Sequence, residues 1–318
     1  MDIRLTGLIA ATYTPLNEDG SLRLAQVQRI TDQLLAEGVS GLYVCGSTGE
    51  GVSLTTAERK AVAEAYVQAA AGRVPVIVQV GHNSLADACD LAAHAQRIRA
   101  DVVSATPPSY FQVASTDLLI DCMAEIATAA PGLPFYYYHI PALSGVTVDV
   151  AEFLRRAGKR IANLAGVKYT APTLDEYQAC IALDDQRYDM LWGVDEMLLS
   201  ALVVGSRGAV GSTYNVGAIL YRQITEAFAR GDLETAGQLQ SLAVRMIGTL
   251  KQYPFHAAMK DLMGWIGLEC GPCRLPQACL RDDERAKLRG ELEQIGFFQW
   301  GRPPIEPASA PAAGDVGA

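Results

Sequence analysis

The sequence of 318 residues predicts an α/β protein, a (β/α)8 TIM barrel with additional C-terminal helices. Short runs rich in β-branched and aromatic residues alternate with amphipathic segments of helix length along residues 1–215. Eight strand-like runs can be counted there, and about 80 residues of helical character follow them. Eight consecutive βα units favour a closed parallel barrel over a doubly wound sheet.

The first four units each combine a short apolar strand with a helix that has one apolar face. We expect strands over 7–13, 41–46, 74–81 and 101–107. The helices that follow them are expected over 22–37, 55–71, 84–99 and 116–129. The second of these helices has the clearest start, because Thr55 and Glu58 lie three residues apart and form a capping box.

The other four strands are expected over 133–141, 163–170, 188–195 and 208–215. The helices between them are expected over 148–157, 173–183 and 196–204. This division predicts a barrel over 1–215 and a C-terminal helical extension, packed on the barrel, over 216–298. Residues 303–318 are rich in Pro, Ala and Gly, a composition typical of a disordered tail.

Composition excludes several classes of partner. The formal net charge is −9 and no Lys/Arg cluster is present, which argues against nucleic acid and against an anionic membrane surface. No segment approaches the roughly 20 apolar residues of a membrane span. The N-terminus lacks the basic region of a signal peptide. We therefore expect a cytoplasmic protein that acts on a small molecule.

The seven cysteines are odd in number and mostly scattered, as expected for free thiols in a reducing compartment. Cys270 and Cys273 form a CxxC, but it lies in a late Gly-Pro turn and not between a strand and a helix. The four histidines are dispersed, so the sequence predicts no metal site. A thiol oxidoreductase is therefore a disfavoured alternative.

Lys168 ends the apolar run of the sixth strand, on the rim where barrel enzymes place their chemistry. Burial lowers the pKa of a lysine, and a neutral amine forms a Schiff base with a ketone. The alternative is a structural lysine paired with Asp195 or Glu196. Tyr138 ends the neighbouring fifth strand, where its phenol can relay a proton or simply fill the core.

Three further rim segments carry polar groups. The turn "GSTGE", residues 46–50, can direct backbone N–H groups and the hydroxyls of Ser47 and Thr48 at a carboxylate, unless it is a plain turn. It lacks the ending of a nucleotide-binding P-loop. Asp195 and Glu196 suit an acid/base pair, a metal site, a clamp for hydroxyls, or a helix N-terminus. Ser212 adds a hydroxyl after the eighth strand.

Several motifs together resemble one family. These are "GSTGE", "YYYHIPALSGV", "GVKYT", "GVDEMLLSALVVGSRGAVGSTYN" and "GPCRLP". Over residues 5–297 the chain resembles the dihydrodipicolinate synthase/N-acetylneuraminate lyase family of class I pyruvate aldolases. Leu143 occupies the position where the synthases typically carry an arginine for the substrate carboxylate. The chain is therefore more similar to the lyase branch.

The resemblance implies roles for the rim residues. Lys168 is expected to form the Schiff base, Tyr138 to relay a proton, and Ser47 and Thr48 to bind the pyruvyl carboxylate. The expected sugar-side contacts are Thr170, Gly193, Asp195, Glu196, Gly211 and Ser212. The implied reaction cleaves N-acetylneuraminate to pyruvate and N-acetylmannosamine. It is expected to need no metal and no organic cofactor, and the family is usually homotetrameric.

Three alternatives stay open at this point. The loop after the fourth strand, "PPSYFQVAS", departs from the more aromatic and proline-rich stretch of the lyases, although Tyr110 resembles their loop tyrosine. This departure keeps open another pyruvate aldolase or a sugar-acid dehydratase of the same family. A 4-hydroxy-tetrahydrodipicolinate synthase is disfavoured by Leu143. A non-catalytic barrel that binds pyruvate is the third possibility.

Overall fold

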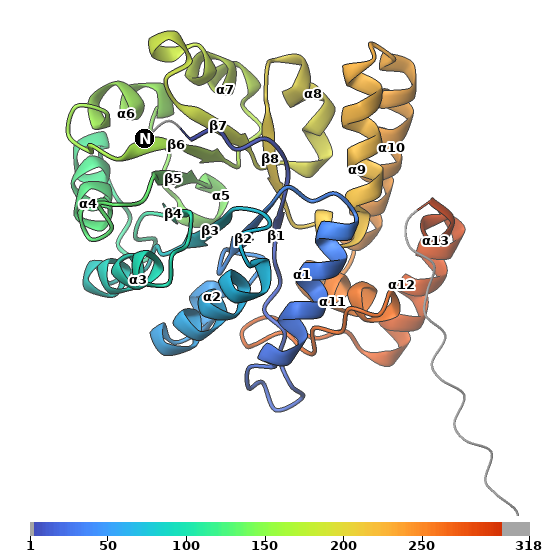
Figure 1. The fold of residues 1–318 in the computed structure, drawn as a ribbon. Coiled ribbons are helices and arrows are strands. Elements are labelled where there is room, and N and C mark those ends of the chain that lie inside the picture. The colour runs from blue at the N-terminus through green and yellow to red at the C-terminus, as the bar shows by residue number, and fades with distance from the viewer. Residues whose placement is uncertain (1–2, 301–318) are drawn as a thin grey trace, which may run out of the picture.

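The computed structural model describes residues 3–300 and forms a closed barrel of eight parallel strands in chain order (Figure 1). This confirms the predicted fold class. The strands are β1 Gly7–Ala11, β2 Gly41–Val44, β3 Val76–Gln79, β4 Val102–Ala105, β5 Phe135–His139, β6 Leu164–Tyr169, β7 Asp189–Trp192 and β8 Gly208–Gly211. They are shorter than predicted, because the last residues of several apolar runs leave the sheet and form the rim. The tail predicted over 303–318 lies outside the described residues.

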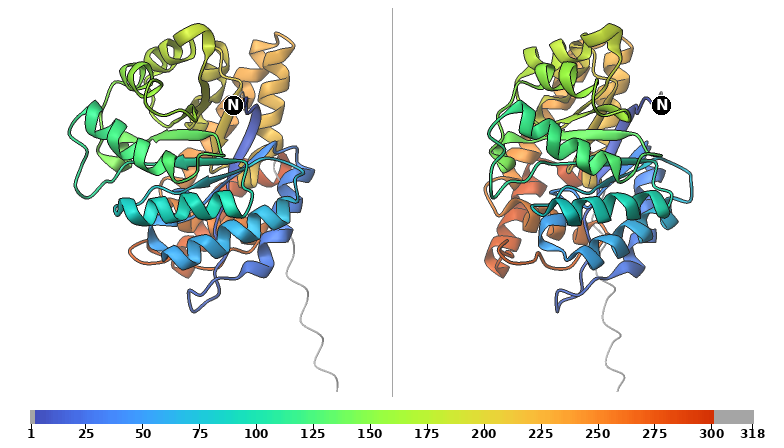
Figure 2. Two further views of the ribbon diagram at one scale, coloured as in Figure 1. Left: turned by 60° about the vertical axis from the view of Figure 1, so that its left-hand side comes forward. Right: turned by 90° about the vertical axis from the view of Figure 1, so that its left-hand side faces the viewer.

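Helices surround the barrel and connect consecutive strands (Figures 1 and 2). They are α1 Val27–Ala36, α2 Thr56–Ala70, α3 Leu85–Arg97, α4 Thr116–Thr128, α6 Val150–Ala157, α7 Leu174–Ile181 and α8 Leu198–Val203. The predicted capping box of α2 is confirmed, since Thr55 and Glu58 each bind the other's backbone N–H. The helix α5 Pro141–Ser144 was not predicted, and it is a single turn with proline at its first position.

Up to residue 300, where the described part of the chain ends, five helices follow β8: α9 Tyr214–Ala229, α10 Leu233–Leu250, α11 Phe255–Trp265, α12 Asp282–Gln294 and α13 Phe297–Trp300. The predicted boundary between residues 215 and 216 falls within the first turn of α9. That helix packs against β1 and α8, so it occupies the last position in the ring of helices. The helices α10 to α13 lie on one side of the barrel, at the right and lower right in Figure 1. The division of the chain into domains stays a prediction.

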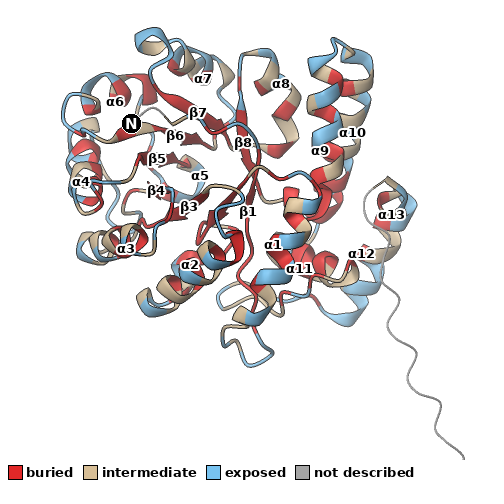
Figure 3. Cartoon of the chain, in the orientation of Figure 1, coloured by how far each residue is buried: buried red, intermediate tan, exposed pale blue. Residues whose placement is uncertain are grey.

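Two layers of buried side chains hold the barrel. The larger one lies between strands and helices, and Figure 3 shows buried positions on the strands and on the inner faces of the helices. The smaller one fills the barrel and includes Ile9, Tyr43, Ile77, Tyr136 and Tyr138. The rings of Tyr43 and Tyr138 meet within this layer, beside Lys168. Among the described residues, none of the helices combines the length and apolar content needed to cross a bilayer.

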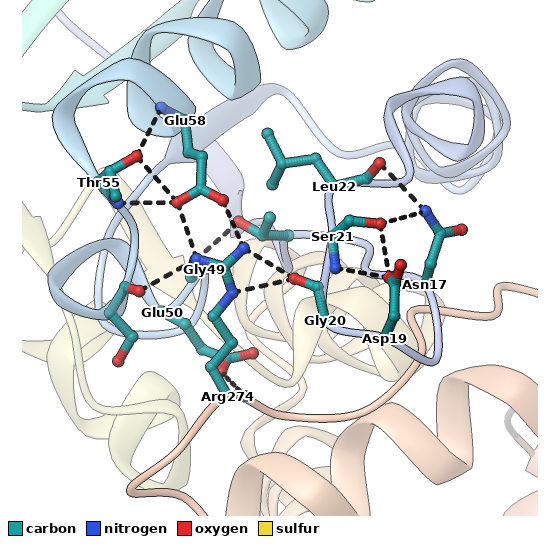
Figure 4. A network of polar contacts seen from close by, with 12 residues as sticks. Asn17, Asp19, Gly20, Ser21, Leu22, Gly49, Glu50, Thr55, Glu58 and Arg274 are labelled. Atoms are coloured by element: carbon teal, nitrogen blue, oxygen red, sulfur yellow. Dashed lines mark hydrogen bonds and ion pairs between the residues drawn. The ribbon is translucent and has the colours of Figure 1, made fainter.

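The C-terminal part is tied to the loop after β2 by a network of charged groups (Figure 4). The Arg274 guanidinium contacts both carboxylate oxygens of Glu58 and donates to the Gly20 carbonyl at 2.7 Å. The Arg274 backbone N–H donates to Glu50 at 2.8 Å. Glu50 also pairs with Lys260 of α11, at 2.5 Å, and both side chains are almost fully buried. The turn over residues 46–50 is therefore held from the C-terminal side.

Candidate active site

A cavity of about 300 Å³ opens at the carboxyl ends of the strands. Nine of the ten residues that the sequence predicts for the site line this cavity. They are Ser47, Thr48, Tyr138, Lys168, Thr170, Gly193, Asp195, Glu196 and Ser212. They come from the rim of β2, β5, β6, β7 and β8, so the barrel brings together segments that lie up to about 165 residues apart. The tenth residue, Gly211, lies beside the cavity and does not line it.

Lys168 lies at the floor of the cavity and its side chain is buried. It is the register partner of Tyr138 on β5, and its Nζ lies 3.9 Å from the centroids of the Tyr43 and Tyr138 rings. Burial lowers the pKa of the Lys168 ammonium, while Tyr138 and Asp195 oppose this shift. Among residues 3–300, no carboxylate lies within ion-pair distance of Lys168. The geometry therefore does not match the alternative interpretation, a structural lysine paired with Asp195 or Glu196.

The turn after β2 presents unused hydrogen-bond donors to the cavity. Within the described chain, the backbone N–H groups of Ser47 and Thr48 form no hydrogen bond. Thr48 Oγ1 lies 2.6 Å from Ser212 Oγ, which joins the rims of β2 and β8. A side chain at Gly51 would place its Cβ 2.0 Å from the Cys45 carbonyl oxygen, so the turn needs glycine there. Free N–H groups and hydroxyls in one turn suit a carboxylate.

Asp195 is held in place by the end of β8. Its Oδ2 accepts hydrogen bonds from the Thr213 backbone N–H at 3.0 Å and from Thr213 Oγ1 at 2.6 Å. Burial raises the pKa of Asp195 to about 6, and the hydrogen bonds from Thr213 oppose this rise. A Cβ at Gly211 would lie 2.2 Å from Asp195 Oδ1. Gly211 therefore leaves room for this carboxylate.

The remaining predicted residues line the side of the cavity at β6 and β7. Thr170 Oγ1 is buried and has no hydrogen-bond partner within the described part of the chain. A Cβ at Gly193 would lie 2.0 Å from this oxygen, so only a glycine at position 193 lets the Thr170 side chain approach the backbone of residue 193 this closely. Glu196 forms an ion pair with Lys251 at the mouth of the cavity. An unpaired buried hydroxyl costs free energy unless a ligand binds it, so Thr170 points to a polar ligand.

Sequence reasoning missed other residues that contact or line the cavity. Tyr43 lies beside Lys168, and its place as the single aromatic residue in an otherwise aliphatic strand was the only signal for it. Lys251, Phe255 and His256 come from the end of α10 and from α11. No local pattern could have located them, because tertiary packing brings them to the rim. The distance from His256 Nδ1 to the Tyr13 hydroxyl is 3.3 Å. Burial lowers the pKa of His256.

The other features singled out in the sequence lie away from this cavity. Cys270 and Cys273 line a second cavity of about 360 Å³, and burial raises the pKa of each thiol to about 12. Such thiols are poor nucleophiles near neutral pH. Among residues 3–300, no group of three or more His, Cys, Asp or Glu is placed to hold a metal ion. Tyr110 is 80% exposed, in the loop after β4.

The cavity thus combines three chemical elements. A buried amine lies at its floor and a phenol lies beside that amine. Unused N–H groups and hydroxyls lie on one wall, and a carboxylate and an unpaired hydroxyl lie on the other. This arrangement suits a molecule with a carboxylate at one end, a carbonyl carbon next to it and hydroxyl groups beyond.

Comparisons with known proteins agree on one family. The model of the "Dihydrodipicolinate synthetase family" matches residues 4–295. N-acetylneuraminate lyase A of Xenopus laevis is 42% identical over 93% of this chain and 98% of its own, and the human N-acetylneuraminate lyase is 39% identical over 93% and 94%. The structure of Proteus mirabilis N-acetylneuraminate lyase covers 93% of this chain and 100% of its own, with a TM-score of 0.90 and 37% identity. The sialic acid aldolase of Aliivibrio salmonicida covers 93% and 98%, with a TM-score of 0.90 and 38% identity.

Proposed function

Because this chain belongs to the dihydrodipicolinate synthetase family, we propose that it is the enzyme that cleaves N-acetylneuraminate to pyruvate and N-acetylmannosamine. The chain is a carbon–carbon lyase of the aldolase type. One observation carries the proposal: the buried Lys168 amine has no carboxylate partner among the described residues and faces Tyr138 below the turn of Ser47 and Thr48. The lyases of frog, human and Proteus mirabilis support the choice of substrate.

The cycle begins with the open-chain keto acid. Its carboxylate binds the N–H groups and hydroxyls of Ser47 and Thr48, which places the C2 ketone above Lys168. The neutral amine attacks C2, Tyr138 donates a proton to the departing C2 oxygen and water leaves, so a cationic iminium forms at Nζ and a phenolate forms at Tyr138. The lowered pKa of Lys168 favours this step, because only the neutral amine is a nucleophile. The iminium formed on Lys168 is the electron sink, so the proposed steps use no metal and no organic cofactor.

Cleavage follows from the iminium. The Tyr138 phenolate accepts the proton of the C4 hydroxyl, the electrons of the C3–C4 bond move into the iminium, and the C4 carbon leaves as the aldehyde of N-acetylmannosamine. The remaining enamine takes a proton at C3, and one water molecule hydrolyses the iminium to pyruvate and free Lys168. Thr170, Asp195 and Glu196 are proposed to bind the hydroxyls of the sugar chain, with Gly193 and Gly211 making room for them.

Other branches of the family share this fold. A dihydrodipicolinate synthase of Bacillus anthracis is also structurally similar, with 26% identity and a TM-score of 0.85. Leu143 is 65% exposed in α5 and brings no charge for a second carboxylate, which favours the lyase over the synthase. The assembly into a homotetramer and the cytoplasmic location stay predictions.

Borohydride trapping tests the proposal. We expect pyruvate and borohydride to leave a reduced pyruvyl adduct on Lys168, detected by peptide mass spectrometry, and none on the equally buried Lys260. In parallel, N-acetylneuraminate should yield pyruvate and N-acetylmannosamine in equal amounts. An adduct without this cleavage would indicate another pyruvate aldolase or dehydratase. The absence of any adduct would overturn the Schiff-base mechanism.

A further inference from the structure

Tyr43 lies beside the reacting nitrogen of Lys168 and has no role in the proposed cycle. Lys168 Nζ lies over its ring, 3.9 Å from the centroid, which is the same distance as from the Tyr138 ring. The two rings meet edge to face with their centroids 5.6 Å apart. Tyr43 comes from β2 and Lys168 from β6, so the ring reaches Lys168 across the interior of the barrel. The proposed cycle gives Tyr138 a role in proton transfer and gives Tyr43 none.

The Tyr43 ring is fixed on several sides. It is 1% exposed, and its hydroxyl donates a hydrogen bond to Ser104 Oγ at 3.0 Å. Gly46 makes room for it, since a Cβ there would lie 2.8 Å from the ring carbon Cε1. The hydroxyl is therefore engaged on β4, and the part of Tyr43 that meets Lys168 is the face of the ring. A ring held this way presents a fixed π surface to the nitrogen.

The charge at this nitrogen changes during the proposed cycle. The attacking amine is neutral, whereas the iminium is a cation at the same buried position. No carboxylate within the described residues lies at ion-pair distance, and the charged or titratable groups that face Nζ are Tyr138 of β5, Asp195 after β7 and Tyr43 itself. An aromatic face attracts a cation, and most strongly where water is excluded.

We propose that the face of the Tyr43 ring stabilises the iminium cation on Lys168 and orients its Nζ, while the Tyr43 hydroxyl only anchors the ring. This inference rests on the proposed Schiff-base function and extends it to a residue that neither the motifs nor the turn singled out. The stabilisation of the iminium should weaken as the negative charge on the ring face decreases. It should not depend on the phenol oxygen.

Fluorination separates this role from packing. Phenylalanine and its mono-, di- and trifluorinated analogues are incorporated at position 43, because fluorine withdraws electrons from the ring face with little change of volume. Borohydride trapping at increasing pyruvate concentration gives the dissociation constant of the iminium complex across pH. Where the amine is neutral, we expect Tyr43→Phe to match the wild type within about twofold and three fluorines to weaken the complex about tenfold. The pKa of Lys168 from the same profiles should fall with each fluorine, because the ammonium loses the same stabilisation.

The same series at Phe153 is the matched control. Phe153 is fully buried and packs on Tyr137, outside the inner layer of the barrel, so its fluorination should change neither quantity. Circular dichroism and thermal melting confirm that each variant folds. A flat series at position 43, or loss of trapping in folded Tyr43→Phe, would overturn the role of the ring face. Failure of the wild type itself to trap pyruvate would instead overturn the proposed function.

Discussion

Two regions of this molecule each bury a lysine to the same degree, and the two lysines differ in their partners. Lys168, at the rim of β6, and Lys260, in α11, are each 4% exposed. Lys260 pairs with the Glu50 carboxylate at 2.5 Å and donates to the Pro272 carbonyl at 2.8 Å. Lys168 has two aromatic rings beside its nitrogen and no carboxylate at ion-pair distance within the described chain.

The difference shows that burial alone does not decide what a lysine does. Removal from water destabilises an ammonium, so the group either loses its proton or acquires a counter-ion. At Lys168 burial lowers the pKa, which raises the fraction of the neutral amine, and the neutral amine is a nucleophile. At Lys260 the second outcome holds, and the ion pair ties α11 to the turn that carries Ser47 and Thr48. The C-terminal extension thereby supports the proposed carboxylate site.

The largest effect is expected from Lys168→Met. This change removes the nucleophile, so we expect lyase turnover to fall by about 10⁴-fold or more and pyruvate trapping to disappear. Stability should be unchanged or higher, because a buried amine is replaced by an apolar side chain of similar length. Initial rates of pyruvate release and thermal melting measure the two quantities. Retained turnover in folded Lys168→Met would exclude Lys168 as the nucleophile.

The converse change is Lys260→Met, which leaves Glu50 buried without its counter-ion. We expect the free energy of unfolding to fall by about 3–5 kcal/mol, as measured by urea denaturation. Trapping on Lys168 should persist below the melting temperature, with a weaker affinity for pyruvate because the turn loosens. The double variant Lys260→Met/Glu50→Gln should recover part of the lost stability. An unaltered unfolding free energy in the single variant would contradict the stabilising role of the Lys260–Glu50 ion pair.

The two lysines also mark the limit of what the sequence could predict. Lys168 ends an apolar run, so the effect of burial on a lysine identified it from the sequence alone. The alternation of strand and helix placed it on the rim. Glu50 lies within the quoted turn, but its partner Lys260 is 210 residues away and on a helix whose position depends on tertiary packing. The predicted strands are longer than the observed ones because they include rim residues that follow the last paired residue of the ladder, such as Thr170 after β6 and Asp195 after β7. Tyr43 could not be assigned to the interior by composition alone.

Asp195 extends the comparison to a buried acid. Its folded pKa of about 6 lies above the value of about 3.8 for an exposed carboxyl, so the native state binds more protons than the unfolded state between pH 4 and 6. The contribution of Asp195 to the free energy of unfolding therefore falls as pH rises through this window. Asp195→Asn keeps an acceptor for Thr213 and removes the titration. Its stability relative to the wild type should rise by up to about 3 kcal/mol from pH 4 to 7 and then level off.

Denaturant curves at several pH values measure this difference. Asp189 is the internal reference, because it is a second buried carboxyl with a raised pKa and accepts hydrogen bonds from Leu5 N and the Tyr136 hydroxyl, outside the cavity. The Asp189 titration should persist in Asp195→Asn. A stability difference that stays constant from pH 4 to 7 would show that Asp195 does not titrate in this window.

The smallest effect on stability is expected from Lys251→Met, because Lys251 is the most exposed of the three lysines compared. Lys251 is paired like Lys260, but its side chain is 59% exposed, so water already solvates the charge. An exposed ion pair contributes roughly 0.2–1 kcal/mol, and we expect the free energy of unfolding to change by no more than that. The Michaelis constant for N-acetylneuraminate should still rise a few-fold, because Glu196 loses the partner that holds it at the cavity mouth, while trapping of pyruvate should be unaffected. A loss of stability as large as that of Lys260→Met would mean that burial does not set the energetic weight of these ion pairs.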